Sequence, residues 1–165
     1  MCGRGRLSAA RWLVAAFSLS AEDARTCDNY ALRRACENGH LDVARWLVAA
    51  FGLNTADARA SGNYALRRSC SGGHLAMAQW LTETFGLSAD DARADNNWAF
   101  RHSCENGHLA VAQWLVATFN LTAADAHSDI CLASYLACTH GYPGVAQWLV
   151  ATFDLEPHCE KCRPP

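Results

Sequence analysis

The chain has 165 residues, of which 51% are apolar and 18% charged, and its formal net charge is −2. This length and composition predict one folded domain, and they exclude a disordered or membrane-spanning protein. The near-neutral charge argues against a dedicated nucleic-acid-binding protein, which would carry a basic excess.

The first residues have the look of a secretory leader, because three arginines precede an apolar run at residues 12–17. The same six residues return at 46–51, and related runs start at three further tryptophans. A segment that recurs inside the chain is a structural element, so we expect a protein that is not secreted.

A 34-residue period runs through the chain, and its clearest marks are Trp12, Trp46, Trp80, Trp114 and Trp148. Fixed periods of this size predict a solenoid, in which units bury their apolar faces against their neighbours. Such a surface favours binding over catalysis. We divide the single domain 1–165 into a leading half repeat 1–27, full repeats 28–61, 62–95 and 96–129, a final repeat 130–156 and a tail 157–165.

The first helix of a unit is expected over residues 29–37, where Leu32, Ala35 and Cys36 share one face. Glycine follows it in every unit, as expected after a helix end, at Gly39, Gly73, Gly107 and Gly141. Asparagine stands where an N-cap would accept from first-turn amides, at Asn29, Asn63 and Asn97.

A second helix is expected from Leu41 to Phe51, with a broad apolar face that includes Trp46. Ala44 precedes the tryptophan by two residues, and a small residue beside a large one lets neighbouring units interdigitate. We therefore interpret the tryptophan column as core, the alternative being an exposed aromatic ladder for binding.

The unit ends with a short capped helical turn, first seen at residues 20–25 and again at 54–59, 88–93 and 122–127. Ser20 is followed three residues later by Asp23, which resembles a capping box with aspartate in place of glutamate. The predicted fold is all-α: an α-solenoid of about four and a half 34-residue repeats.

One cysteine per unit keeps the same period, at Cys36, Cys70, Cys104 and Cys138. Neighbouring helices lie about 8–10 Å apart, beyond the roughly 4.4–6.8 Å between Cα atoms of a disulfide. We expect buried free thiols and a reducing compartment.

The segment Gly39–Val48 (GHLDVARWLV) resembles the ankyrin-repeat signature, and residues 30–36 fall where that family has its Thr-Pro-Leu-His segment. The chain is most similar to the divergent ankyrin-like arrays of large DNA viruses. It departs from the family in its 34-residue unit and in a helical stretch after Phe51 where the family forms a β-hairpin.

The resemblance implies a concave surface that binds a protein partner, possibly a host protein, through residues around the first helices. We place the partner-binding candidates at Asn29, Arg34, Glu37, Asn38, Asn63, Arg68, Ser71, Asn97, Glu105 and Asn106. In the alternative interpretation, the asparagines only cap helices while Glu37 and Glu105 pair with Arg33 and Arg101.

Two adjacent basic residues recur on the first helices, and the pattern ends in the final unit; the positions are Arg33/Arg34, Arg67/Arg68, Arg101/His102 and then Tyr135/Leu136. This basic ladder would suit an acidic peptide or a phosphate backbone. The acidic neighbours Glu37 and Glu105 weaken that interpretation, and we predict no nucleic-acid partner.

Other chemistry is sparse in this sequence. His40, His74 and His108 lie in separate units, so we expect each to hydrogen-bond nearby backbone instead of sharing a metal. The tail offers one weak metal-site candidate, His158, Cys159 and Cys162, which could equally be an incidental thiol pair. No nucleophile triad or phosphate loop is evident, so we predict a non-enzymatic protein without a cofactor.

We therefore predict a cytoplasmic protein-interaction module, in the host cytosol if the chain is viral, with no membrane partner. Two alternatives remain open. Exposed ends could drive end-to-end self-association of a structural solenoid. The Cys159/Cys162 pair could act as a thiol- or metal-dependent switch.

Overall fold

The computed structural model describes the backbone of residues 3–122 and 127–157, and the tail candidates His158, Cys159 and Cys162 lie outside these ranges. The described residues are helical and contain no strand, which confirms the all-α prediction. The helices are α1 (Gly3–Phe17), α2 (Ala21–Glu37), α3 (Leu41–Phe51), α4 (Thr55–Ser71), α5 (Leu75–Phe85), α6 (Ala89–Glu105), α7 (Leu109–Phe119), α8 (His127–Thr139) and α9 (Pro143–Phe153).

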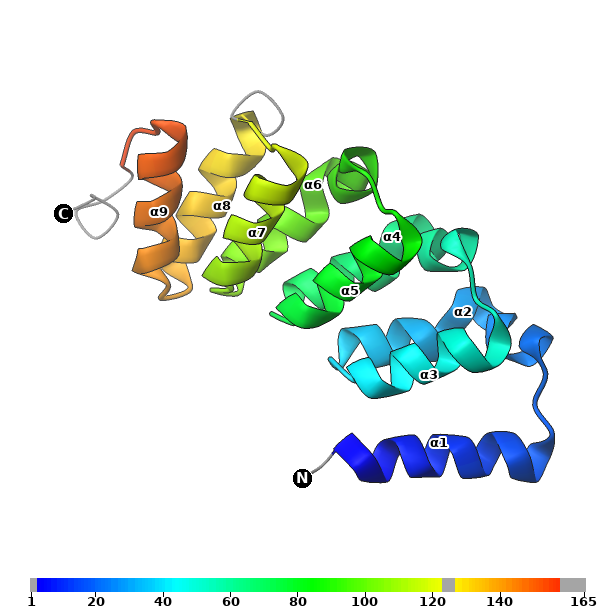
Figure 1. The fold of residues 1–165 in the computed structure, drawn as a ribbon. Helices are drawn as coiled ribbons and strands as arrows, with labels where there is room; N and C mark the ends of the chain where they lie inside the picture. The colour runs from blue at the N-terminus through cyan, green and yellow to red at the C-terminus, as the bar shows by residue number, and fades with distance from the viewer. Residues whose placement is uncertain (1–2, 123–126, 158–165) are drawn as a thin grey trace.

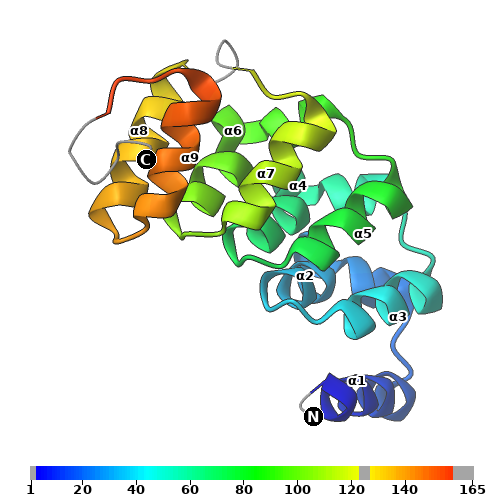
Figure 2. The ribbon, with the colours of Figure 1, turned by 60° about the vertical axis from the view of Figure 1, so that its left-hand side comes forward.

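The helices form a curved stack in chain order, with α1 at one end and the α8–α9 pair at the other (Figures 1 and 2). The first helices α2, α4, α6 and α8 pack closely on one another, whereas the second helices α3, α5 and α7 lie further apart. This difference follows from side-chain size, because small residues such as Ala65 and Ser69 face neighbouring first helices while tryptophan and phenylalanine fill the second-helix row. No described helix is long and apolar enough to cross a bilayer.

The predicted capped helical turn is confirmed at residues 20–25, 54–59 and 88–93, while residues 123–126 of the fourth predicted turn lie outside the described residues. Each confirmed turn forms the start of the next long helix, at residues 21–25, 55–59 and 89–93. The amides of Ser20, Asn54 and Ser88 each donate to an aspartate three residues on, at 2.8 Å in all three units. Aspartate thus closes a capping box in the place that glutamate usually fills.

A left-handed turn follows each of these caps and separates the short helical turn from the first helix proper. In α2 it comprises Cys27, Asp28 and Asn29, with φ of 50°, 56° and 60°. The predicted N-cap role of the asparagines is wrong, because the buried side-chain oxygens of Asn29 and Asn63 accept no hydrogen bond. Asparagine tolerates the left-handed conformation better than most residues, which is a physical reason for its presence at this position.

The core runs along the stack as one cluster that includes the fully buried Leu32, Leu66 and Leu81. The second-helix tryptophans are half-buried, and each packs edge-on against the phenylalanine five residues later; the pairs are Trp46–Phe51, Trp80–Phe85, Trp114–Phe119 and Trp148–Phe153. Their interpretation as core residues is confirmed for these four units. Trp12 on α1 differs, with 66% of its surface exposed.

The recurring cysteines are free thiols, as predicted, and three of them are fully buried. Burial raises the pKa of Cys36 and Cys104 to about 12. A thiol held protonated is a poor nucleophile.

We expect iodoacetamide to modify the exposed Cys27 in the folded protein and to spare Cys36, Cys70 and Cys104. Peptide mass spectrometry after labelling in native buffer measures this directly, with labelling in denaturant as the control. Equal modification of Cys27 and Cys70 in native buffer would contradict the buried placement.

Two glycines mark places where neighbouring repeats approach closely. Gly39 has φ +68°, and a Cβ placed there would lie 2.5 Å from the His74 ring of the next unit. Gly73 has φ +74° and faces His108 in the same way, at 2.6 Å. Only glycine satisfies both the backbone conformation and the ring contact.

We expect Gly73→Ala to lower the free energy of unfolding clearly more than Gly86→Ala. Gly86 has φ +59° but nothing within 4 Å of a Cβ, so its substitution carries only the left-handed strain of about 1–2 kcal/mol. Urea unfolding of the two variants isolates the ring contact, since both share the positive φ. Equal losses would mean that the His108 ring simply moves aside.

Candidate protein-binding surface

The first helices end in a row of polar side chains that we name the first-helix strip. The side chains lie three residues apart on one helix or at the start of the following turn, so they share a face. Most are exposed or half-buried. The strip consists of Arg34, Glu37, Asn38, Arg68, Ser71, His102, Glu105, Asn106 and His140.

Two glutamates join the strip across repeat boundaries. Glu37 pairs with Arg34 on its own helix and lies 4.0 Å from Arg68 of the next unit. Glu105 lies 2.8 Å from the His102 ring and 3.9 Å from that of His140. The alternative interpretation paired Glu37 with Arg33 and Glu105 with Arg101. The side chains that they contact on their own helices are instead Arg34 and His102, which lie three residues away and not four.

Arg33 and Arg67 make contacts that stabilise the fold. Arg33 donates to the Cys27 carbonyl at 2.7 Å, which closes the left-handed turn, and its guanidinium lies 4.8 Å from the centre of the Tyr64 ring. Arg67 repeats this arrangement with the Ser61 carbonyl and the Trp98 ring. In these two units, only the second arginine of each pair in the basic ladder, Arg34 or Arg68, therefore belongs to the first-helix strip.

Arg68 lies between two rings, 5.1 Å from the centres of both Tyr64 and Trp98. Stacking of this kind holds a guanidinium in place without neutralising its charge. The Trp98 ring continues the column by stacking on His102, with ring centres 4.0 Å apart. Aromatic residues therefore preorganise Arg68 and His102 in the middle of the strip.

Three of the candidate contact residues, Asn29, Asn63 and Asn97, have buried side chains. They lie in the left-handed turns and do not reach the first-helix strip. The remaining candidates all belong to the strip. Asn38 and Asn106 are exposed there, and the Asn106 amide also donates to the Ser71 carbonyl of the preceding unit at 3.0 Å.

Ion pairs between consecutive caps connect the repeats, and the sequence reasoning missed them. Arg25 donates to Asp57 at 3.0 Å, and Arg59 donates to Asp91 at 2.8 Å. A signal for them was available, since the tripeptide Asp-Ala-Arg recurs every 34 residues at 23–25, 57–59 and 91–93. The capping pattern alone is enough to explain the aspartate in the sequence, so its second role as the partner of an arginine was not considered.

These pairs shift the titration of the aspartates. Arg59, followed by the amide and hydroxyl of Ser88, lowers the pKa of Asp91 to about 2 against the opposing effect of burial. Burial would raise the pKa of Asp57, but the Asn54 amide, Arg25 and Asn29 together hold it below its ordinary value.

His74 and His108 hydrogen-bond nearby backbone, as predicted. The Nε2 atom of His74 lies 3.1 Å from the Glu37 carbonyl oxygen of the preceding unit. Burial lowers the pKa of His108, and a hydrogen bond with the Ser71 backbone partly opposes that effect. Within the described residues, no group of three histidine, cysteine or acidic side chains could hold a metal ion.

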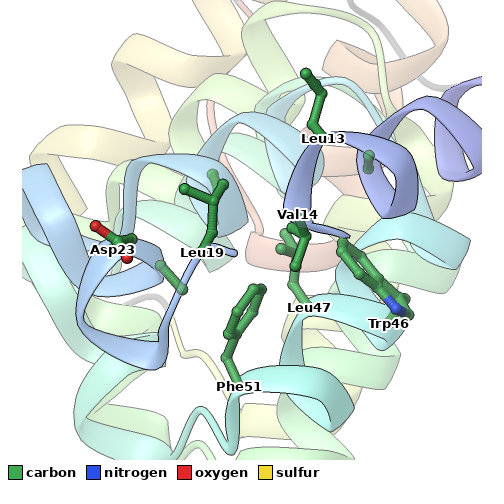
Figure 3. A pocket seen from close by; sticks show the side chains of 10 residues that line it. Leu13, Val14, Leu19, Asp23, Trp46, Leu47 and Phe51 are labelled. Atoms are coloured by element: carbon green, nitrogen blue, oxygen red, sulfur yellow. The ribbon is translucent and has the colours of Figure 1, made fainter. Parts of the chain in front are cut away.

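A separate hollow lies between α1, α2 and α3 (Figure 3). Its volume is about 190 Å³, and its walls are apolar except for Asp23. Leu13 and Val14 on α1 line one side, while Trp46 and Phe51 on α3 line the other. The hollow holds no combination of groups that indicates catalysis.

The family model of ankyrin repeats in many copies matches residues 1–48 and 32–82. Ankyrin repeats are therefore detected over residues 1–82 of this chain. No curated protein and no solved structure matches the chain. Ankyrin repeats generally mediate protein–protein interactions and are typically non-enzymatic. The helical start of each long helix distinguishes this ankyrin array from members that carry a β-hairpin there.

We expect acid to weaken this ankyrin array as the Arg59–Asp91 pair is lost. The folded-state pKa of Asp91 lies below the ordinary value of 3.8, so its stabilising contribution is present above about pH 4 and disappears toward pH 2. Asp91→Asn should cost about 1–2 kcal/mol at pH 7 and should flatten the acid dependence, as measured by urea unfolding at several pH values. Glu22→Gln, at an exposed site, is the control. An unchanged acid slope in Asp91→Asn would contradict the role of this pair.

Proposed function

We propose that this protein binds another protein through the first-helix strip and catalyses no reaction. The cytosol is the proposed site of action, and a host protein is the proposed partner if the chain is viral. Support comes from the ankyrin repeats and from the placement of the exposed candidates on one row along the stack.

The charge pattern of the strip is interrupted in the middle unit, where an acidic residue is missing. Arg34 has Glu37 on its own helix, and His102 has Glu105, but Arg68 is followed at the equivalent position by Ser71. The nearest carboxylate, Glu37, lies 4.0 Å from Arg68. Ser71 donates to the Arg68 backbone carbonyl at 3.3 Å and offers no charge. The middle unit therefore carries a positive charge without its own acidic partner.

An acidic side chain of the partner fits this position. Arg68 is held by Tyr64 and Trp98, so a carboxylate would meet a guanidinium that is already oriented. His102 stands next along the strip; burial lowers its pKa, and the charge of Glu105 opposes that effect. The first-helix strip thus favours an acidic segment that crosses the middle of the array.

We expect Arg68→Glu to abolish capture of the partner, because it places like charge against the incoming carboxylate. Affinity capture from cytosol with quantitative mass spectrometry compares Arg68→Glu, Arg45→Glu and the native chain. Arg45 is exposed on α3, so its substitution makes the same charge change on the second-helix row.

The expected result is a protein captured by the native chain and by Arg45→Glu but not by Arg68→Glu. Circular dichroism of all three proteins controls for folding. Capture of the same proteins by all three would exclude the middle of the strip as the binding site.

A further inference from the structure

In the middle unit, a serine at the end of α4 takes the position that glutamate has in the units on either side (Figures 1 and 2). Glu37 and Glu105 are each the last residue of their helix, and each contacts a basic side chain three residues earlier. Ser71 is likewise the last residue of α4 and follows Arg68 by three residues. The helix therefore places Ser71 beside Arg68 in the same spacing that joins Glu37 to its arginine.

The Ser71 hydroxyl and the Arg68 guanidinium are both weakly engaged. Within the described part of the chain, the half-buried hydroxyl donates to the Arg68 carbonyl at 3.3 Å, which is long for a hydrogen bond between oxygens. The carboxylate nearest to Arg68 is that of Glu37 at 4.0 Å, and Glu37 already pairs with Arg34 at 2.5 Å. An acidic group on Ser71 would thus meet a guanidinium that the two flanking rings hold in place.

The residues before Ser71 have the charge pattern of a kinase substrate. Arg68 and Arg67 stand three and four residues before it, and no other serine or threonine of the sequence has an arginine three residues before it. Kinases select their substrates by such charge patterns. Ser71 is therefore the hydroxyl that an arginine-directed serine kinase would select in this sequence.

The end of α4 is also easier to open than the ends of the other first helices. Asparagine or histidine follows the equivalent residue in the other units, whereas Gly72 and Gly73 follow Ser71. The Asn38 side chain closes its own helix end by donating to the Arg34 carbonyl at 2.7 Å, and Gly72 has no side chain that could do so. Because glycine gains more backbone freedom on opening than other residues, the local unfolding that exposes Ser71 to a kinase costs less here.

We propose that Ser71 is a phosphorylation site and that its phosphate pairs with Arg68, which withdraws this guanidinium from a protein partner. The withdrawal rests on the proposed function, since the acidic segment of the partner is what loses Arg68. An arginine-directed serine kinase transfers the γ-phosphoryl group of ATP. The bond from Ser71 Oγ to phosphorus forms, the bond from that phosphorus to the bridging oxygen breaks to release ADP, and the hydroxyl proton passes to the catalytic base of the kinase. The phosphate carries about −1.5 to −2 charge at pH 7 and accepts two hydrogen bonds from the guanidinium.

The repeat tolerates negative charge at this position. A negative charge at the end of a helix opposes the helix dipole, yet Glu37 and Glu105 occupy the same place with a basic side chain three residues earlier. Phosphorylated Ser71 beside Arg68 reproduces the charge pattern of both neighbouring units, so we expect the fold to stay intact.

Phosphorylation is tested with the purified full chain, ATP and a serine kinase that requires arginine three residues before its target. Peptide mass spectrometry should locate phosphate on Ser71, and Ser71→Ala should take up none in that peptide. A synthetic peptide of residues 64–75 controls for recognition of the sequence, because it lacks the packing of the folded chain. Phosphorylation of the peptide but not of the folded chain, or of neither, would overturn the proposal.

Pairing with Arg68 is measured by ³¹P NMR of the phosphorylated chain at several pH values. A guanidinium favours the doubly charged phosphate, so the second pKa of phosphoserine should lie at least about 0.5 below its ordinary value of about 6 in the folded chain and return to that value in urea. The same pKa in the folded and the urea-unfolded chain would overturn the pairing.

Affinity capture with the phosphorylated chain tests the consequence for binding. It should lose the partner as Arg68→Glu does, and treatment with a phosphatase should restore capture. Equal capture by the phosphorylated and unphosphorylated chains would overturn the withdrawal of Arg68. If neither captures a protein, the proposed function fails, whereas phosphorylation of Ser71 and its pairing with Arg68 are decided by the two preceding measurements.

Discussion

The carboxylates of Asp57 and Asp91 each fix both the start of a helix and the distance to the preceding repeat. Asp91 accepts from the Ser88 amide within its own unit and from Arg59 of the unit before it. One side chain therefore couples local structure to stacking. Short-range capping alone would leave neighbouring units free to shift, because first helices that meet through alanine, serine and cysteine have few interlocking side chains. The Arg–Asp pair and the glycine–ring contact remove that freedom.

This coupling explains why the surface is regular in position but varied in charge. The stacking contacts repeat every 34 residues, so side chains of the first-helix strip arrive at fixed intervals. Some strip residues also contact the next unit, as Glu37 does with Arg68, but the strip residues differ between units: Arg68 corresponds to His102, and Glu37 corresponds to Ser71. We infer that binding specificity comes from these differences.

Much of the fold could be predicted from the sequence, because it depends on contacts within about four residues. The bounds of α3, the capping box at Ser20 and the closing role of Gly39 all follow from such local patterns. Contacts between units were harder to predict from the sequence, because they depend on how far one first helix is shifted along the next. Neither the Arg59–Asp91 pair nor the stacking of Arg33 on Tyr64 can be predicted from spacing along one helix. The asparagine prediction failed for a related reason: Asn29 is compatible with both an N-cap and a left-handed turn, and the residues around it do not decide between them.

Hydrogen exchange of the chain, alone and with a captured partner, tests the binding role of the first-helix strip most directly. We expect added protection at the ends of the first helices, in peptides covering residues 30–38, 64–72 and 98–106, strongest around Arg68. Protection confined to the second helices, at residues 41–51, 75–85 and 109–119, would contradict this expectation. That result would assign recognition to the tryptophan-bearing row and leave the first-helix strip without a binding role.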